Sequence, residues 1–380
     1  MSQPLFLYLH FPYCWSKCHY CAFNSIRYDK PQSLRFLSAL KMEIERCGRS
    51  PRVESRPLST IYMGGGTPSI FSAEQILEVL DHCRDHFRFA DNIEITVEAN
   101  PGTVDFKKLA ALNAGGINRL SLGVQSFQDP ELVWLGRAHN AEAARAAIQT
   151  ARAAGFANLN LDFIYALPGQ RLEDWERTLR EAVDLGPEHL SAYALTIEEG
   201  TRFGTDFDNG LIVLPDEEHQ IRFDEFTWDL LEQAGYVRYE ISNYAKAGAA
   251  CRHNLSYWNQ QDYLGLGPGA HSYLGGRRFS KIESIDRYIR EVNEGGDAVD
   301  ETDSIDSDLA CREAVIFGLR KTEGICYDDI LRRHPPSDAG ALREKFGELG
   351  REGLLVEDPS RLRLSPRGLQ VWDRIAEGIL

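Results

Sequence analysis

The sequence predicts an α/β protein: a (β/α)6 partial, TIM-like barrel, then an extension and a small winged-helix-like α+β module. Three observations predict this organisation. Six short apolar runs recur up to about residue 200, and helical patterns separate them. The regular alternation then stops, and a different succession of helices and a hairpin begins near residue 305. We therefore expect a barrel over residues 1–200, an extension over 201–304 and a C-terminal module over 305–380.

The six expected strands are short runs, and each is followed by a turn rich in glycine, proline or asparagine. Strands that alternate with helices indicate right-handed βαβ units and a parallel sheet. Six units are fewer than the eight of a closed barrel, which favours a partial barrel, with an open doubly wound sheet as the alternative. The runs span residues 5–12, 60–68, 93–102, 117–127, 157–169 and 189–201.

Parallel strands bring the turns at their carboxyl ends to one edge of the sheet, where chemistry gathers in such folds. Five motif-like turns should converge there. They are the cysteine-rich stretch after the first run, followed in order by "GGGTP", "EANP", "GVQSF" and "ALPG". Between two of the runs, "NAEAARAAIQTARAAG" carries Asn140 as an expected N-cap and Gly155 as an expected stop signal.

The bulk composition limits the partners and the compartment. The chain has 380 residues and a net charge of −15, and its basic pairs are short, so we expect no nucleic-acid partner. The first apolar run lacks the basic start and cleavage site of a signal peptide. No stretch approaches the ~18 apolar residues of a transmembrane helix. We expect a cytoplasmic protein, with peripheral membrane contact left open.

The chain after residue 200 is less regular. A helix over 216–235 leads to a single expected strand over 236–245, then to "HNLSYW" at 253–258 and to the turn "GLGPGAHS" at 265–272. Helices near 308–320, 326–333 and 339–351, a hairpin over 353–368 and a last helix form the C-terminal module. From residue 305 onward 12 basic residues face 14 acidic ones, which favours a lid or packing role over DNA binding.

Three of the eight cysteines, Cys14, Cys18 and Cys21, lie within eight residues at spacing C-x3-C-x2-C. In a reducing compartment such a group indicates a metal or redox centre rather than disulfides. Zinc prefers four ligands, and His19 as the fourth would strain the loop. A [4Fe–4S] cluster held by three thiolates leaves one iron open for a small molecule. Zinc and plain thiols are the alternatives, and we expect the other five cysteines to be structural thiols.

The cysteine motif, with Tyr20 before its last cysteine, resembles that of the radical S-adenosylmethionine superfamily. "GGGTPS" at 64–69 is similar to the glycine stretch with which that superfamily contacts S-adenosylmethionine. Together with "EANPG", "NRLSLGVQSF", "LGRAH", "NLDFIYALPGQ" and "YWNQQDYLGLGPGAHS", these motifs resemble the coproporphyrinogen III dehydrogenase-like group. The resemblance implies a [4Fe–4S] cluster on the three cysteines and S-adenosylmethionine on its fourth iron. It further implies that the cofactor site is lined by Tyr8, Tyr20, Gly65, Gly66, Thr67, Glu98, Gln125, Arg137 and Asp162.

Two departures distinguish the chain from the oxygen-independent dehydrogenase of that group. The dehydrogenase motif continues to a fourth cysteine, where this chain has Phe23, and it follows an N-terminal extension, whereas only thirteen residues precede Cys14 here. Both departures favour the heme chaperones of the group over oxidative decarboxylation of coproporphyrinogen, which remains the alternative. We leave open whether the chain is an enzyme.

"HNLSYW" matches the motif by which those chaperones are thought to hold heme, and it implies a heme site at His253, Asn254, Tyr257 and Trp258. An imidazole can ligate iron, and aromatic rings supply flat surfaces beside a macrocycle. Cys251 and His271 are competing iron ligands, although the turn of His271 is expected to face the cluster. A structural histidine beside a core aromatic pair is the alternative. The resemblance implies that heme is passed on to respiratory-chain or other hemoproteins.

Overall fold

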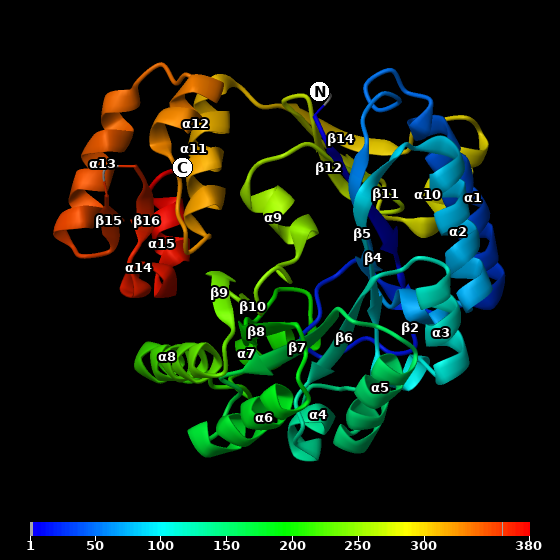
Figure 1. Cartoon of the computed structure of the whole chain (residues 1–380), viewed down its shortest axis with the longest axis horizontal. Helices are drawn as coiled ribbons and strands as arrows, with labels where there is room; N and C mark the ends of the chain where they lie inside the picture. Colours follow the sequence, from blue (N-terminus) through cyan, green and yellow to red (C-terminus); the bar gives the residue numbers. More distant parts are fainter. Residues whose placement is uncertain (1–2, 359) are drawn as a thin grey trace.

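The computed structural model describes residues 3–358 and 360–380, and its main feature is a curved sheet of twelve strands. Six parallel strands form its centre in the predicted order, and the strands at the two ends of the sheet do not pair, so the barrel is open (Figure 1). The predicted partial barrel is therefore confirmed. The central strands are β1 Leu5–Phe11, β4 Leu58–Gly65, β5 Phe89–Ala99, β6 Arg119–Gln125, β7 Leu159–Tyr165 and β8 His189–Ala194.

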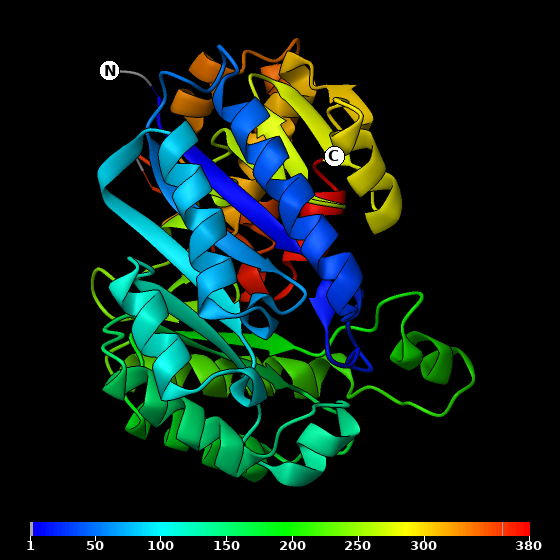
Figure 2. The ribbon, with the colours of Figure 1, turned by 90° about the vertical axis from the view of Figure 1, so that its right-hand side faces the viewer.

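Helices cover the convex face of this sheet (Figure 2). Capping residues in the sequence set the ends of these helices, as α5 Ala141–Ala153 shows. Asn140 caps its helix as predicted, since its side chain accepts a hydrogen bond from the Ala143 amide at 2.9 Å. Gly155 takes a φ of 96° just beyond the end of the same helix. The helices in this layer are α1 Lys30–Gly48, α2 Ala73–His86, α3 Phe106–Ala114, α4 Asp129–Trp134, α5 Ala141–Ala153, α6 Leu172–Asp184 and α8 Glu217–Gln233.

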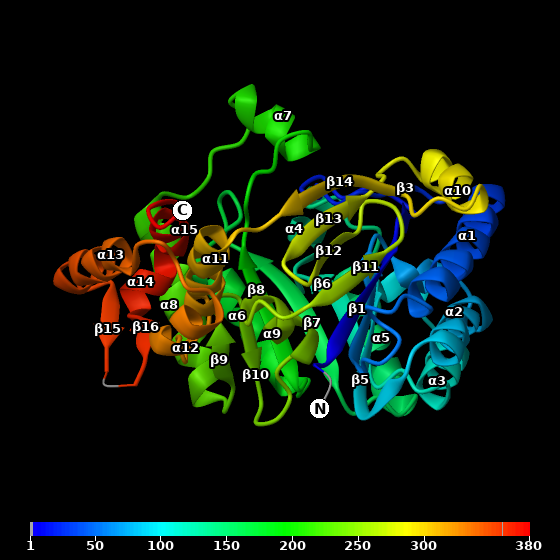
Figure 3. The same ribbon diagram turned by 90° about the horizontal axis from the view of Figure 1, so that it is seen from above.

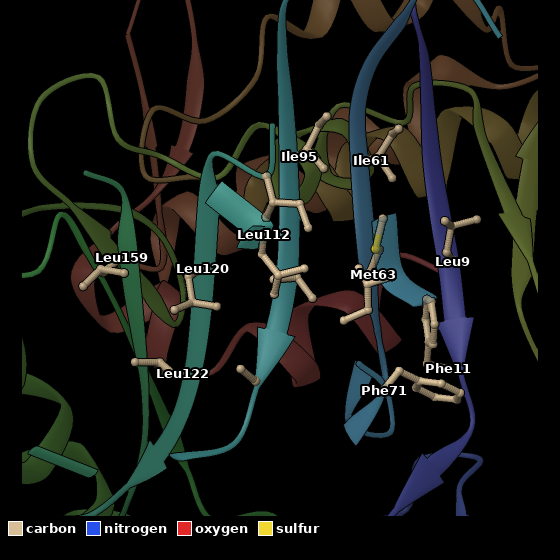
Figure 4. Packing of buried hydrophobic residues seen from close by; sticks show 14 of the residues in the cluster. Leu9, Phe11, Ile61, Met63, Phe71, Ile95, Leu112, Leu120, Leu122 and Leu159 are labelled. Atoms are coloured by element: carbon tan, nitrogen blue, oxygen red, sulfur yellow. The ribbon is translucent and has the colours of Figure 1, made fainter. Parts of the chain in front are cut away.

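The largest hydrophobic core lies between the sheet and these helices (Figure 4). Leu9 and Phe11 of β1 and Met63 of β4 are fully buried, and Phe71 packs edge-on against Phe11 with ring centroids 5.4 Å apart. Strands buried on both faces give continuous apolar runs, which is why these segments could be found in the sequence. The core holds the strand ends, and the turns beyond them, in a defined place.

The extension over 201–304 lengthens the same sheet at both edges. β11 Tyr263–Leu266 lies parallel to β1, and β12 His271–Leu274, β13 Arg277–Lys281 and β14 Val299–Ser304 follow it outward. At the other edge the expected single strand over 236–245 is wrong: it consists of two antiparallel strands, β9 Val237–Glu240 and β10 Asn243–Ala245. Asp224 and the Ile241 carbonyl hold Arg238 at this turn, which an apolar pattern alone does not reveal.

Three helices complete the extension. α9 Arg252–Trp258, which carries "HNLSYW", connects the two edges and lies across the opening of the sheet (Figure 1). α7 Arg202–Asp208 projects from the body on a long loop (Figure 3), and α10 Ile285–Asn293 packs beside α1.

The last part of the chain has a core of its own, beside the sheet on the α8 and β9 side. Glu240 of β9 forms an isolated antiparallel bridge with Lys321, and Trp228 of α8 packs against this second core. Pro359, within the expected hairpin, lies outside the described residues. The elements are α11 Ser307–Leu319, α12 Tyr327–Arg333, α13 Ala339–Arg351, β15 Leu355–Glu357, β16 Leu362–Leu364, α14 Pro366–Gln370 and α15 Trp372–Glu377.

Within the described part of the chain, no helix has both the length and the apolar character needed to cross a membrane.

Candidate functional site

Two adjoining cavities lie at the carboxyl ends of the central strands. The first, of about 580 Å³, contains all three motif cysteines in its wall and is called the cysteine cavity below. The second, of about 670 Å³, is called the aromatic cavity after its tyrosines, Trp258 and two phenylalanines. Ala22, Phe23, Gly65 and Glu98 line both cavities. The two spaces are therefore neighbours, and the residue in place of a fourth cysteine lies between them.

The loop that carries the cysteines is held at both ends. The short strands β2 Tyr13–Cys14 and β3 Ile26–Arg27 pair in parallel, and the Tyr28 amide donates to the Cys14 carbonyl at 2.8 Å. In the middle of the loop, the His19 amide donates to the Leu135 carbonyl at 3.1 Å. This anchoring presents Cys14, Cys18 and Cys21 from one short loop to one cavity, as the spacing predicts.

The surroundings of the thiols suit a positively charged centre. Burial raises the pKa of Cys14 and of Cys21, and the neighbouring cysteines raise both further. Arg137 donates from Nη1 to the Cys18 sulfur at 3.3 Å. The three cysteines are partly buried, and iron bound there would supply the positive charge that favours thiolates. The residues therefore fit an iron–sulfur cluster.

His19 does not complete a zinc site. Its Nδ1 hydrogen-bonds to the Trp134 carbonyl at 2.8 Å, and its Nε2 to Arg202 at 2.9 Å. Both ring nitrogens are therefore engaged outside the cysteine group. Across residues 3–358 and 360–380, no three metal-ligating side chains gather closely enough to hold a single ion. Thiols that line a shared cavity without converging on one point suit a polynuclear cluster better than zinc.

The glycine stretch after β4 packs tightly on the end of β1. Gly65 has a φ of 102°, and a Cβ there would lie 2.4 Å from the His10 ring. A Cβ on Gly66 would meet the Phe11 carbonyl at 2.6 Å, the same carbonyl that accepts from the Gly66 amide at 2.8 Å. The Thr67 amide donates to Tyr13. Close approach is required here as expected. These two amides already donate to the Phe11 and Tyr13 carbonyls, so neither of them is free to bind a ligand.

Glu98, at the end of β5, faces both cavities. Its carboxylate accepts from the Tyr62 hydroxyl at 2.8 Å and from the Gly65 amide at 3.2 Å. Burial raises its pKa to about 7, and nearby Asp162 adds to the rise. Glu98 can therefore change charge near neutral pH, which suits contact with an amine or with hydroxyl groups.

Asp162 of β7 reaches the same wall from the neighbouring side. It accepts from Asn160 at 2.8 Å and from Ser121 at 3.0 Å, and burial raises its pKa. Gln125, at the end of β6, lies on this wall with a φ of 69°, a conformation uncommon for residues other than glycine. The strand ends thus deliver three of the predicted side chains to one space.

Arg137 connects the cysteine loop to the strand ends. It donates to Asn100, to the Gly123 carbonyl at 2.6 Å and to the Tyr20 hydroxyl at 3.4 Å. Its Nε is buried without a partner among the described residues. A guanidinium with a spare buried donor fits a carboxylate, such as that of S-adenosylmethionine.

Two features that were predicted for the cysteine cavity, Tyr8 and the "ALPG" turn, do not line it. Tyr8 lies on the aromatic cavity and not on the cysteine cavity, and its hydroxyl contacts His10 Nδ1 at 3.1 Å. The "ALPG" turn follows β7 at the expected edge, yet its residues belong to neither described wall. Leu167 of that turn packs in a small apolar cluster with Leu135 and Phe203 instead. The apolar Leu167 side chain is removed from water in this cluster, and this draws the turn away from the polar cavity wall.

Sequence reasoning missed several wall residues. Asn100 donates to Thr67 at 2.9 Å and accepts from Arg137, so it links two predicted contacts. Tyr62 positions Glu98, and Ser121 positions Asp162. Asn100 could have been found in the sequence, because it is the third residue of the "EANP" motif. The other two are ordinary strand residues, and only their register in the sheet reveals them.

The four residues predicted to bind heme do not all lie on the same cavity wall. Tyr257 and Trp258 line the aromatic cavity, whereas His253 and Asn254 do not. His253 is 1% exposed; its Nδ1 contacts Thr60 at 2.6 Å and its Nε2 contacts Tyr257 at 2.8 Å. Burial, with Arg119 nearby, lowers the pKa of His253 to about 3. His253 is a neutral, fully bonded histidine behind Tyr257, and iron ligation by it stays a prediction that requires the Tyr257 bond to break.

The competing ligands also have defined places. Cys251 is fully buried, and burial raises its pKa to about 12, so it is held as a neutral thiol away from both described walls. His271 lines the aromatic cavity rather than the cysteine cavity, contrary to the expectation that its turn faces the cluster. β12 lies outside β11 in the sheet, two strands from β1, and His271 at its start shares the wall of the aromatic cavity with Phe23.

Comparison with known proteins identifies two matching families. Residues 8–182 match the radical SAM superfamily, and residues 305–371 match the HemN C-terminal domain. The chain is 34% identical to the heme chaperone HemW of Bacillus subtilis over 95% of each chain. It is 43% identical to HemW of Haemophilus influenzae over 76% of each chain. A mitochondrial radical S-adenosyl methionine domain-containing protein 1 of Bos taurus is 33% identical, over 100% of this chain and 88% of its own.

Among solved structures, the coproporphyrinogen III oxidase HemN of Escherichia coli, described as a radical SAM enzyme, superimposes with a TM-score of 0.84. That similarity covers 100% of this chain and 90% of HemN, at 26% sequence identity. Fold alone therefore does not separate the chaperones from the oxidase.

Proposed function

Since the chain belongs to the HemW-type heme chaperones of the radical SAM superfamily, we propose that it binds heme and hands it to other hemoproteins. Its cysteine cavity would hold a [4Fe–4S] cluster and S-adenosylmethionine, and heme would occupy the aromatic cavity. The observation that carries the proposal is the pair of adjoining cavities with different chemistry. One has three thiols and polar groups, and the other has four tyrosines, two phenylalanines and a tryptophan in its wall.

In the cysteine cavity, Cys14, Cys18 and Cys21 would ligate the cluster. Arg137 and Gln125 would bind the amino-acid end of S-adenosylmethionine, with Tyr20 beside them. A reduced cluster of this kind supplies an electron to S-adenosylmethionine. Glu98 and Asp162 would accept hydrogen bonds from hydroxyl or amine groups, and Gly65, Gly66 and Thr67 would shape the floor.

In the aromatic cavity, Tyr257 and Trp258 would lie against the macrocycle, as the motif predicts. His253 would act by positioning Tyr257 through their 2.8 Å hydrogen bond, and Asn254 would contribute through the shape of α9. Tyr8, predicted for the cofactor, lies where it would contact heme instead. The eight cysteines are unpaired, which suits a reducing compartment such as the cytoplasm, and respiratory-chain proteins are the recipients we propose.

Anaerobic reconstitution of the full chain with iron and sulfide tests the proposal. The protein should bind iron and sulfide in a one-cluster ratio and then take up heme stoichiometrically, without decarboxylating coproporphyrinogen. Cys14→Ser, Cys18→Ser and Cys21→Ser should each abolish the cluster, while Cys326→Ser, outside both cavities, should retain it. Production of protoporphyrinogen would contradict the proposal and establish the decarboxylase alternative, and a protein with zinc and no iron would overturn both.

A further inference from the structure

The heme proposed above needs an iron ligand, and the described aromatic cavity contains only two imidazoles, His10 and His271. His10 is engaged at both ring nitrogens, by Tyr8 at 3.1 Å and by the Asn24 carbonyl at 2.8 Å. The His271 side chain is exposed and has no hydrogen-bond partner within the described residues. It is therefore the one imidazole in this cavity wall that can bind a metal without losing an existing contact.

His271 is held on a rigid element. It begins β12 and pairs with Ser280 of β13. Its backbone packs so closely on β11 that a Cβ on Gly265 would lie 2.1 Å from the His271 carbonyl. The next residue, Ser272, accepts from the Gly265 amide at 2.9 Å. A ligand on a strand fixed in this way has a defined position, unlike one on a free loop.

A cationic side chain lies on the same face of this sheet edge. Arg278 of β13 pairs with Tyr273 of β12, and Tyr273 is two residues from His271. Side chains at i and i+2 share a face, and paired residues of neighbouring strands share it too. His271, Tyr273 and Arg278 all line the cavity, in agreement with this register.

Arg278 retains donors for an anionic ligand. It gives one donor to Glu313 at 2.8 Å, and a guanidinium has five in total. Trp258 lines the same cavity, and its Nε1 is buried without a partner among the described residues. A cavity with flat aromatic walls, one unengaged imidazole and donors for carboxylates matches an iron porphyrin, whose ring is apolar and whose edge carries two carboxylates.

We propose that His271 ligates the heme iron in the aromatic cavity and that Arg278 binds a heme propionate. This inference rests on the proposed function. The cavity volume of about 670 Å³ falls within the ~300–1,000 Å³ usual for ligand sites. Cys251 is sealed in the core, and ligation by His253 would require the breaking of a hydrogen bond that His271 does not have to lose.

The experiment compares heme with iron-free protoporphyrin IX on the full-length, cluster-loaded protein. His271→Ala should weaken heme binding at least tenfold (about 1.4 kcal/mol), shift its visible absorption spectrum and leave protoporphyrin IX binding unchanged. Added imidazole should restore the wild-type heme spectrum. Arg278→Gln should weaken both porphyrins alike, since both carry the carboxylates. His219→Ala, an exposed histidine on α8, is the matched control and should behave as wild type.

Each outcome separates the two proposals. If wild-type protein takes up no heme, the proposed function itself fails. If wild-type protein binds heme but His271→Ala retains its spectrum and affinity, the function stands and His271 is not the ligand. Cluster content measured on every variant shows that the fold is intact, so a loss of heme binding with a full cluster complement supports the assignment.

Discussion

At the scale of single residues, position 23 lies where the two cavities meet. Phe23 replaces the fourth cysteine of the dehydrogenase motif, is 65% exposed and lines both cavities. A thiol there would add a fourth sulfur near the cluster, whereas the phenyl ring forms part of the boundary that the two cavities share. Phe23, which is visible in the sequence, therefore also lies between the proposed cluster site and the proposed heme site.

Glu98 should make S-adenosylmethionine binding depend on pH. With its pKa near 7, the carboxylate is mostly neutral at about pH 6 and mostly ionised at about pH 8. If the ionised form accepts the ligand's hydrogen bonds, affinity should rise roughly tenfold over that interval. Equilibrium binding to reconstituted protein measures it, and Glu98→Gln should flatten the profile; an equally steep profile in that variant would assign the titration to another group.

At the scale of elements, α9 shows how a motif can be structural and functional together. Its first half is buried against β4 and β5, where Glu94 accepts from the His253 amide at 3.1 Å. Its last residues, Tyr257 and Trp258, face the aromatic cavity. One short helix therefore connects the inner surface of the barrel to the proposed heme, with His253 as the link between them.

His253→Ala should destabilise the protein whether or not heme is present. The change leaves Thr60 buried without its partner and opens a small void, which costs about 2–4 kcal/mol of unfolding free energy. Denaturant unfolding of the apo-protein measures the loss. His82→Ala on α2, which lacks a buried partner and bonds only to the Glu78 carbonyl, should stay within about 0.5 kcal/mol of wild type.

His253 should also make the unfolding free energy of the protein depend on pH in the acid range. Its pKa falls to about 3 in the folded state from 6.5. Below pH 6.5 the unfolded chain therefore binds a proton that the native site does not, so stability declines as pH drops from 6.5 toward 3. Unfolding free energy measured against pH should fall less steeply in His253→Ala than in wild type. Equal slopes would show that His253 is already protonated, or exposed, in the native protein.

At the scale of the whole molecule, distant parts of the chain meet around the aromatic cavity. Its wall draws on β1, the cysteine loop, α9, β11 to β13 and, through Phe317, on α11 of the C-terminal module. The charge balance of that module pointed to packing or a lid rather than DNA binding. The structure gives the module a specific contact with the proposed heme space.

Phe317→Ala should therefore weaken porphyrin binding without affecting the cluster. Loss of part of the apolar wall is worth ~1 kcal/mol, or about fivefold in affinity, for heme and for iron-free porphyrin alike. Fluorescence quenching or absorbance titration measures both. Val371→Ala, a partly buried residue on the same core but outside both cavities, is the control. Unchanged affinity in Phe317→Ala would confine the module to a structural role.

The sequence by itself determined the six central strands, the partial barrel and the cysteine loop. These follow from local signals: buried parallel strands give unbroken apolar runs, turns carry glycine and proline, and chelating cysteines lie close together in the chain. Tertiary structure alone decided which cavity each side chain faces. β11 pairs with β1 through residues as distant in the chain as Phe6 and Tyr263. This pairing cannot be inferred from local pattern, because register between distant strands depends on packing across the whole sheet. That pairing turns His271 into the aromatic cavity, while burial and two hydrogen bonds enclose His253 behind it.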